Sequence, residues 1–260
     1  MSACWPAAAA ATLALALVAP VAIAQRRDTP LGSSAHMGRE SPQSFAAELR
    51  FAPFSPDVDS DPALHGKTPY QDAFGSAPRL MLSVELDWQA LRIPHLGTIG
   101  PGAGAGYTSI SRPALFVTPH QPGGTLVSGE DTTLEIFPFY AVAVLRADAL
   151  WREVGVPLVP YAKVGLGYAL WRASNTLGTS NTGGVSGEGH SIGSHVAIGI
   201  SLNLNPFDEY AAKTFDDSLG VNNSYLFGEW THEDLSGLGL QHNPLRVGGT
   251  SWTFGLAFEF

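Results

Sequence analysis

Five charged residues have the types and spacing to form an ion network. They are Lys163, Glu85, Glu135, Glu229 and Glu259, each of which alternates with apolar residues along the chain. A charge without a partner in a low-dielectric interior costs several kcal/mol, so Lys163 predicts a carboxylate beside it. Because acids outnumber the base, the set fits a structural salt-bridge network or a cation-selective lining.

Serine and histidine lie side by side twice, in His190-Ser191 and Ser194-His195. A hydrolase acting on lipid needs a serine nucleophile with a histidine base. Neighbours in a strand point to opposite faces, so neither pair forms a dyad through adjacency alone. We therefore expect ordinary residues at these positions and no catalytic residue.

Three carboxylates at alternate positions, Asp57, Asp59 and Asp61, are typical of the start of a calcium loop. Pro62 stands where such a loop needs glycine, and Thr68 stands where it needs a bidentate glutamate. We expect a solvated acidic loop.

Other metal and phosphate patterns are weak. His120, His232 and His242 lack the close spacing of metal ligands, and no helix signal follows the glycine-rich run 102–106, as a phosphate-binding loop requires. The prediction is therefore no metal and no cofactor.

The composition argues for a surface that does not all face water. Of the 260 residues, 14% are charged and 45% are hydrophobic, with a formal net charge of −9. Soluble domains carry about 25% charged residues. The chain has no basic stripe, which argues against nucleic acid as a partner.

The first 24 residues have the pattern of an export signal. An uncharged Ala/Leu-rich stretch, 7–19, ends near Ala22-Ile23-Ala24, a small-x-small cleavage site before Gln25. Cys4, the single cysteine, lies within residues 1–24 and before the apolar stretch, so cleavage leaves a chain without cysteine and therefore without disulfides. Residues 25–43 read as a flexible leader, and a third segment, 44–260, follows it.

This third segment alternates with a period of two. At its end Trp252, Phe254, Leu256, Phe258 and Phe260 are large and apolar, and the intervening residues are small or polar. A terminal aromatic residue after such a strand resembles the assembly signal of bacterial outer-membrane barrels. One face of these strands is therefore predicted to contact lipid.

The same alternation predicts eight strands. They are 44–52, 80–88, 96–108, 132–145, 158–172, 190–203, 223–232 and 252–260. In strand 132–145 we assign Leu134, Ile136, Tyr140, Val142 and Val144 to lipid and Glu135 to the lumen. The glycines of strand 96–108 suit a sharply curved wall or one that faces bulky lumen side chains. The predicted fold is an all-β, eight-stranded antiparallel up-and-down transmembrane β-barrel with one short helix between strands six and seven.

An even strand number puts both barrel termini on the periplasmic side and makes connections 53–79, 109–131, 173–189 and 233–249 external. The periplasmic connection 204–222 is long because it predicts a helix at 206–219. Asn205 can cap this helix, Pro206 fits its first position and Gly220 can end it. Its apolar stripe, which includes Phe215 and Leu219, could close the barrel mouth, lie against the rim or pack on the turn.

Three stretches resemble a family of predicted outer-membrane β-barrel proteins found mainly in myxobacteria. They are Val156 to Tyr168, Asn205 to Glu229 and Trp252 to Phe260. The resemblance covers the second half of the chain. It implies an outer-membrane location and carries over no catalytic residue, since that family has no settled activity.

These observations predict a non-enzymatic outer-membrane protein of a Gram-negative envelope, with long external loops and a structural or surface-interaction role. Its expected partners are outer-membrane lipid and, during biogenesis, the barrel-assembly machinery; an external partner stays unknown. An eight-stranded lumen is nearly filled by side chains, which favours the structural ion network. The alternatives are a lipid-modifying barrel enzyme, a narrow porin-like pore or carrier of a small apolar ligand, and a secreted β-sandwich.

Overall fold

The computed structural model describes residues 44–115, 127–182, 184–241 and 244–260, which all belong to one compact unit. The predicted export signal, 1–24, and leader, 25–43, lie outside the described residues, as do His120 and His242.

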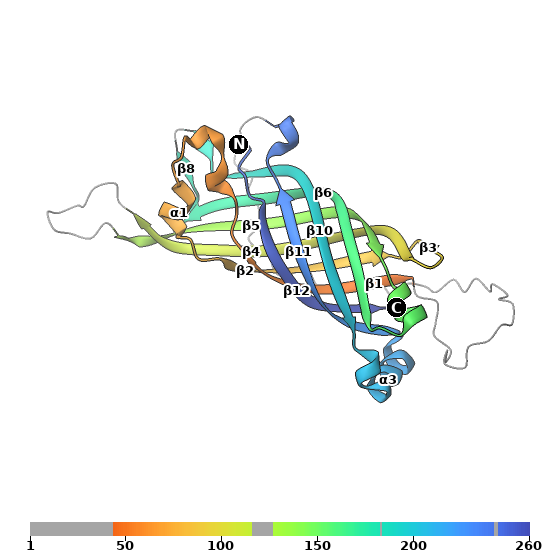
Figure 1. Cartoon of the computed structure of the whole chain (residues 1–260). Coiled ribbons are helices and arrows are strands. Elements are labelled where there is room, and N and C mark those ends of the chain that lie inside the picture. Colours follow the sequence, from red (N-terminus) through yellow and green to blue (C-terminus); the bar gives the residue numbers. More distant parts are fainter. Residues whose placement is uncertain (1–43, 116–126, 183, 242–243) are drawn as a thin grey trace, which may run out of the picture. The chain divides into compact units, whose positions relative to one another are not determined.

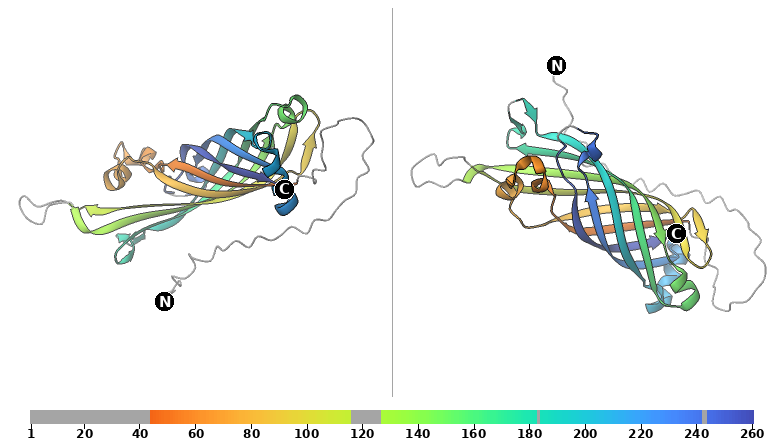
Figure 2. Two further views of the ribbon diagram at one scale, coloured as in Figure 1. Left: turned by 90° about the horizontal axis from the view of Figure 1, so that it is seen from below. Right: turned by 45° about the horizontal axis from the view of Figure 1, so that its top comes forward.

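Eight long strands form a closed antiparallel barrel (Figures 1 and 2). They are β1 (Phe45–Phe54), β2 (Arg79–Trp88), β4 (Gly97–Leu115), β5 (Val127–Arg146), β6 (Leu158–Asn175), β10 (Glu188–Asn203), β11 (Asn223–Asp234) and β12 (Gly249–Glu259). Each pairs with the next, and β12 pairs with β1, where Leu49 lies opposite Leu256. The predicted eight-stranded barrel is confirmed. The alternative β-sandwich is wrong, because a single sheet closes on itself.

The two ends of the barrel differ. One end, here called the turn end, carries both barrel termini, and the backbone N–H of Ser44 donates to Phe260 O at 2.8 Å. Its connections contain β3 (Leu91–Ile93), α2 (Ala149–Val154), the 3-10 helix η4 (Asn205–Phe207) and α3 (Glu209–Leu219). The opposite end, here called the loop end, carries η2 (Val58–Ser60), η3 (Pro62–Leu64), α1 (Pro69–Phe74), β7 (Gly178–Thr179), β8 (Asn181–Thr182), β9 (Val185–Ser186) and η5 (Gly237–Gly239).

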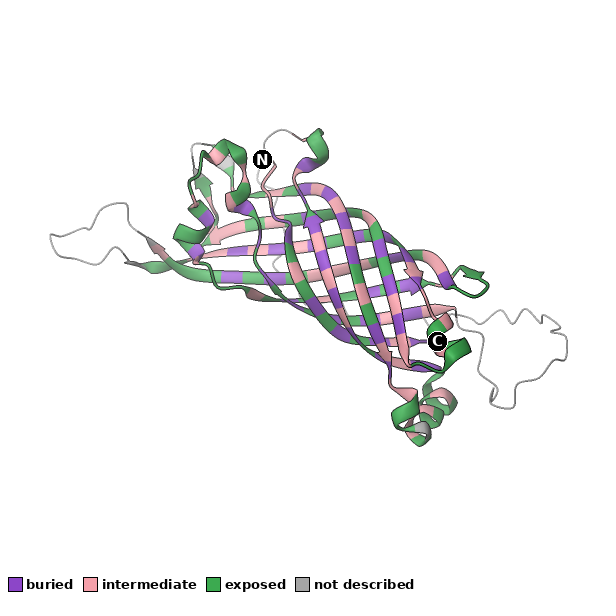
Figure 3. Cartoon of the chain, in the orientation of Figure 1, coloured by how far each residue is buried: buried purple, intermediate pink, exposed green. Residues whose placement is uncertain are grey.

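The strands alternate between exposed apolar and buried residues, as Figure 3 shows. In β2, Leu82, Val84 and Leu86 are exposed while Glu85 and Asp87 are buried. This is the reverse of a water-soluble barrel, which keeps its charges outside. The predicted outward rows are confirmed in six strands, including Trp252, Phe254, Leu256 and Phe258 of β12. No outward row was predicted for the glycine-rich strand 96–108.

Strand β5 has the opposite orientation to the predicted one. Leu134, Ile136 and Val144 are buried in the lumen, whereas Glu135 lies on the outer face, where its carboxylate accepts from Tyr107 Oη at 3.1 Å. Within the predicted range 132–145, both faces are largely apolar and Glu135 is the one charge, so alternation alone could not choose between them. Its partner strand decides: Val144 lies directly opposite the buried Lys163, and opposite residues share a face.

Two predicted connections also change. Because β4 continues to Leu115 and β5 begins at Val127, residues 109–115 and 127–131 of the predicted loop 109–131 belong to a two-stranded ribbon (Figure 1). The predicted helix 206–219 is confirmed as η4 and α3, but Asp208 rather than Asn205 caps α3, by accepting from the N–H of Ala211 at 2.9 Å.

The loop-end half of the lumen is filled by an apolar core, here called the plug. Strand residues such as Phe54, Ile110 and Ile136 pack there against Tyr70 of α1 and Leu235 of the last connection. The N–H of Asp57 donates to Gly248 O at 2.7 Å and ties these two connections together. The chain therefore closes this end of the barrel with its own loops.

Among the described residues, no helix is both long enough and apolar enough to span a membrane.

Candidate functional site: a buried ion cluster in the lumen

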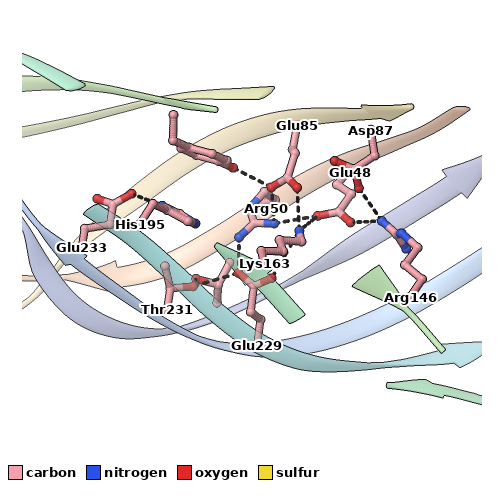
Figure 4. Close-up of polar contacts among 12 residues, drawn as sticks. Glu48, Arg50, Glu85, Asp87, Arg146, Lys163, His195, Glu229, Thr231 and Glu233 are labelled. Atoms are coloured by element: carbon pink, nitrogen blue, oxygen red, sulfur yellow. Dashed lines mark hydrogen bonds and ion pairs between the residues drawn. The ribbon is translucent and has the colours of Figure 1, made fainter. Parts of the chain in front are cut away.

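Seven charged residues from five strands meet inside the barrel below the plug (Figure 4). This lumen cluster consists of Glu48 and Arg50 (β1), Glu85 and Asp87 (β2), Arg146 (β5), Lys163 (β6) and Glu229 (β11). They meet because each occupies a position of its strand whose side chain points into the lumen, and because the strand register sets Glu48 directly opposite Glu85.

Lys163 lies at the centre of the lumen cluster. Its side chain is buried, and Nζ lies 2.8 Å from Glu48 Oε2, 2.7 Å from Glu85 Oε1 and 3.3 Å from Glu229 Oε2. The ammonium also lies 5.0 Å from the centre of the Tyr161 ring, within cation–π range. The predicted partner of Lys163 is therefore a set of three carboxylates.

Two arginines complete the lumen cluster. Arg50 Nη1 donates to Glu48 Oε2 at 2.6 Å and to Glu85 Oε2 at 2.7 Å, and its Nη2 pairs with Glu229. Arg146 Nη2 bridges Glu48 Oε1 at 2.5 Å and Asp87 Oδ2 at 2.7 Å. Every cation thus contacts at least two carboxylates. Such ion pairs offset the free-energy cost of removing the charged groups from water.

The five predicted network residues separate into three groups. Lys163, Glu85 and Glu229 belong to the lumen cluster. Glu259 is buried nearer the turn end, where it accepts from Tyr225 Oη at 2.8 Å and Gln89 Nε2 at 2.8 Å. The assignment of Glu135 to the lumen is wrong, for the reason given for β5.

Sequence reasoning missed Glu48, Arg50 and Arg146. Glu48 and Arg50 occupy the even positions of β1, whose odd positions were assigned to lipid, so the alternation itself was the signal that could have found them. Arg146 is the last residue of β5 and was placed in a connection, so its inward position depended on the strand boundary.

Glycines in the wall make room for the large lumen side chains. A Cβ on Gly104 would lie 2.2 Å from Tyr140 Cζ, and one on Gly199 would lie 2.5 Å from Tyr161 Cζ. Tyr140 is held in place, since its hydroxyl donates to Glu85 Oε2 at 2.7 Å. Of the two explanations for the glycine-rich strand, opposition to bulky side chains therefore applies at Gly104.

A second polar pair lies between the lumen cluster and the plug. The buried His195 places Nδ1 2.8 Å from Glu233 Oε1 and stacks on Tyr140 at 4.2 Å between ring centres. Its Nε2 has no hydrogen-bond partner among the described residues. The pair borders a cavity of about 30 Å³, which also touches Arg50 and Thr231 and has room for about two water molecules.

The adjacent serine and histidine residues do not form dyads, as expected from their alternation. Ser191 Oγ donates to Leu245 O at 2.6 Å in the plug region, whereas His190 lies outside and stacks on Tyr168. His195 does have an orienting acid, Glu233, which sequence reasoning did not connect with it. The two residues are direct cross-strand partners, so only the strand register could reveal the pair.

The acidic run of the first loop has structural roles. Asp59 accepts from the backbone N–H groups of Tyr70 and Gln71, both at 2.8 Å, and so caps α1 from a distance. Asp61 caps η3 by accepting from Ala63 N. Within the described segments, the one close group of possible metal ligands is Glu48, Glu85 and Asp87, and Lys163, Arg50 and Arg146 already contact these carboxylates.

The chain matches no family model and no curated protein. The resemblance to myxobacterial barrels therefore stays a prediction from the sequence. Structural neighbours are outer-membrane β-barrel proteins. Ail, the attachment invasion locus protein of Yersinia pestis, has a TM-score of 0.39 and 10% identity over 84% of this chain and 97% of its own.

Two further neighbours are the N-terminal β-barrel domain of OprF from Pseudomonas aeruginosa and a major outer membrane protein from Thermus thermophilus. The first has a TM-score of 0.36 and 9% identity over 84% of this chain and 98% of its own. The second has a TM-score of 0.36 and 12% identity over 84% of this chain and 99% of its own.

Proposed function

We propose that this chain is an outer-membrane β-barrel protein, with its turn end in the periplasm and its loop end outside the cell. The observation that carries this proposal is the inversion of polarity: the outer faces of the strands are apolar and the lumen holds the charges. Soluble monomers rarely expose contiguous apolar surface of this extent. Lipid is the solvent that suits such a surface.

The height of the apolar surface fits a membrane. Outward residues run from Trp252 in β12 to Phe260, which directly follows this strand, and from Leu158 to Leu170 in β6. At about 3.4 Å per residue and a tilt near 40°, these rows rise about 20 and about 30 Å. An outer-membrane barrel has an apolar band of about 25 Å.

The filled lumen supports a structural role over transport. The plug occupies the loop-end half, and the lumen cluster joins five strands in the middle. The cavity between them accommodates water but not a solute or an acyl chain. We propose that the barrel neither conducts nor carries an apolar ligand.

The His195–Glu233 pair is the one observation that favours the alternative of a lipid-modifying enzyme, since a base oriented by an acid is part of hydrolase chemistry. Its cavity lies below the plug and inside the wall, away from the lipid. We therefore propose that the protein is not an enzyme. If His195→Phe abolished a lipase activity of the refolded protein while leaving the barrel folded, this part of the proposal would be wrong.

The loop end offers the surface for contact with other molecules. The β4–β5 ribbon extends beyond the pairing of β4 with β2, which ends at Tyr107, and the helical first connection stands beside it (Figure 1). Because the plug and the Asp59 cap hold this connection in one conformation, it suits recognition by a rigid surface. We propose a surface-interaction role there, with a partner that the residues do not name.

Cell fractionation tests the location. The full chain, expressed in a Gram-negative host, is expected in the outer membrane, with a new N-terminus at Gln25 and a gel mobility that changes on heating. Phe260→Ala is expected to lower the amount of assembled barrel, because the terminal aromatic residue resembles the assembly signal. Val154→Ala, at an exposed residue of the same end, is the control. A chain that stays soluble in the periplasm would contradict the proposal.

Liposome swelling tests the closed lumen. Vesicles that contain the refolded barrel are expected to swell in small sugars no faster than empty vesicles. Swelling at the rate of a known porin would show an open path and favour the pore alternative.

A further inference from the structure

Helix α3 exposes an apolar face at the turn end of the barrel. On this face Phe215 is exposed by 44% and Leu219 by 63%. Ala211, Phe215 and Leu219 recur every four residues and therefore share one face of the helix. This face covers no part of the plug or of the lumen cluster.

The helix is well formed, so its exposed face is a built feature. Asp208 caps its first turn, and Gly220 ends it in the left-handed conformation at φ 70°. Asn205 joins it to the rim, since its Nδ2 donates to Asn222 O at 2.7 Å and to Asn223 Oδ1 at 3.0 Å. A helix fixed in this way presents one side to its surroundings.

The connection that carries α3 starts beside the lipid-facing surface of the barrel. The N–H of Leu204, just before η4, donates to Ser224 O at 2.8 Å. Leu226, which is exposed on the outer wall, follows Ser224 by two residues, or about 7 Å along the strand. Figure 1 shows α3 at the rim with β3 and α2, to the side of the wall.

We propose that α3 lies in the interface of the periplasmic lipid leaflet, with Phe215 and Leu219 in the acyl region and its polar side toward the periplasm. This inference rests on the proposed membrane location. The other side carries the exposed residues Tyr210, Lys213, Thr214 and Asp217, which are spaced by three and four residues and are polar apart from the tyrosine ring. Amphipathic helices bind bilayers in this way, by burying an apolar face at the headgroup boundary.

The charge of the helix decides what kind of contact this is. Residues 208–219 contain four acids and one base, a net charge of −3. Attraction to anionic headgroups therefore cannot hold the helix, and apolar burial must. Because salt screens repulsion and leaves apolar burial in place, the contact is expected not to weaken as the salt concentration rises.

Spin labels on single cysteines test the placement. The mature chain has no cysteine, because Cys4 lies in the predicted export signal. Nitroxides are placed by Phe215→Cys and Leu219→Cys on the apolar face and by Thr214→Cys and Asp217→Cys on the polar side. The labelled barrels are refolded into vesicles of phosphatidylethanolamine and phosphatidylglycerol, and collisions with oxygen and with a water-soluble nickel chelate are measured. Val164→Cys, on the exposed outer wall, is the membrane control.

The expected result is a reversal between the two faces. Labels at 215, 219 and 164 collide with oxygen more than with nickel, and labels at 214 and 217 do the opposite, at both low and high salt. Nickel access at 215 and 219 with lipid access at 164 would overturn the inference and leave the membrane barrel intact. Nickel access at 164 as well would overturn the proposed function. Labels at 215 and 219 that neither reagent reaches would overturn the lipid contact in favour of a protein contact.

Discussion

At the scale of single residues, the lumen is organised by charges that share partners. Glu48 accepts from Arg50, Arg146 and Lys163, so three strands depend on one carboxylate. Four acids and three bases make up the cluster, and each base lies within 3.3 Å of its carboxylates. Such a network contributes little net free energy relative to an apolar core, but removing one member leaves its partners buried and uncompensated.

Replacing Lys163 is therefore expected to destabilise the barrel strongly. Lys163→Met leaves Glu48, Glu85 and Glu229 without their shared ammonium, at a cost of about 3–5 kcal/mol in the free energy of unfolding. Urea unfolding in detergent micelles, followed by tryptophan fluorescence, measures it.

The control is Lys213→Met on the exposed side of α3, which is expected to change stability by less than about 0.5 kcal/mol. Adding Glu229→Gln to Lys163→Met is expected to restore part of the loss, because it removes one uncompensated charge. Equal stability of Lys163→Met and the unmodified chain would contradict the network.

A glycine substitution tests the packing of the lumen wall. In Gly104→Ala the new methyl would lie 2.2 Å from Tyr140 Cζ, and this ring cannot retreat without losing its bond to Glu85 and its stacking on His195. We expect a loss of about 1–3 kcal/mol, as for other overpacked cores.

Gly228→Ala is the matched control. It also lies within a strand, but its methyl would contact Phe254 at an ordinary 3.5 Å. Urea midpoints of the two variants should differ clearly. A Gly104→Ala variant as stable as Gly228→Ala would show that Tyr140 moves freely.

At the scale of elements, all eight strands could be predicted from the sequence, but only six could be oriented. In β2 and β12 polar or small residues occupy one face only, so alternation decides the orientation. In the predicted range of β5, 132–145, both faces are largely apolar, and Glu135 is the one charge. It lies outside because Tyr107 and the opposite Arg172 give it polar surroundings there. Orientation of such a strand depends on its register with β6, which is a long-range property.

The helices also differ in how far local sequence could predict them. The caps and the apolar stripe of α3 are local, so its presence could be predicted. Helix α1 was not predicted, because its cap, Asp59, lies ten residues before its first residue, Pro69. Only the folded loop brings the two together.

Removing this remote cap should loosen the first connection. Asp59→Ala leaves two backbone N–H groups of α1 without their acceptor, at a cost of about 1 kcal/mol, concentrated in residues 58–74. Faster hydrogen exchange at Tyr70 and Gln71, with unchanged exchange in β6, is the expected result. Asp57→Ala is the control, because that side chain makes no capping bond to η2. Equal protection in both variants would assign the stability of α1 to the plug alone.

At the scale of the whole molecule, an even number of antiparallel strands allows the sheet to close through the pairing of β12 with β1. The strand number and order could be predicted from the alternation. The contents of the lumen could not be predicted fully. The plug combines loop residues from two distant connections with strand residues, and the lumen cluster joins charges from five strands. These groups meet only because the barrel closes with one register, so register is the property that links fold and site.

An engineered disulfide tests this closing register directly. Leu49 and Leu256 lie opposite each other where β1 meets β12, and opposite residues in antiparallel strands have Cα atoms about 4.5–5.5 Å apart, within disulfide range. In a Cys4→Ser background, Leu49→Cys with Leu256→Cys is expected to oxidise readily in the folded barrel and not in urea. Labelling with a maleimide polymer before and after reduction measures the fraction bonded.

Leu49→Cys with Trp252→Cys is the control pair, since Trp252 lies four residues, or about 14 Å, farther along β12 than Leu256. It is expected to keep two free thiols under the same conditions. Equal oxidation of both pairs would mean that β1 and β12 slide past each other. A shift of that size would separate Glu48 and Arg50 from Glu229, so the lumen cluster could not form as described.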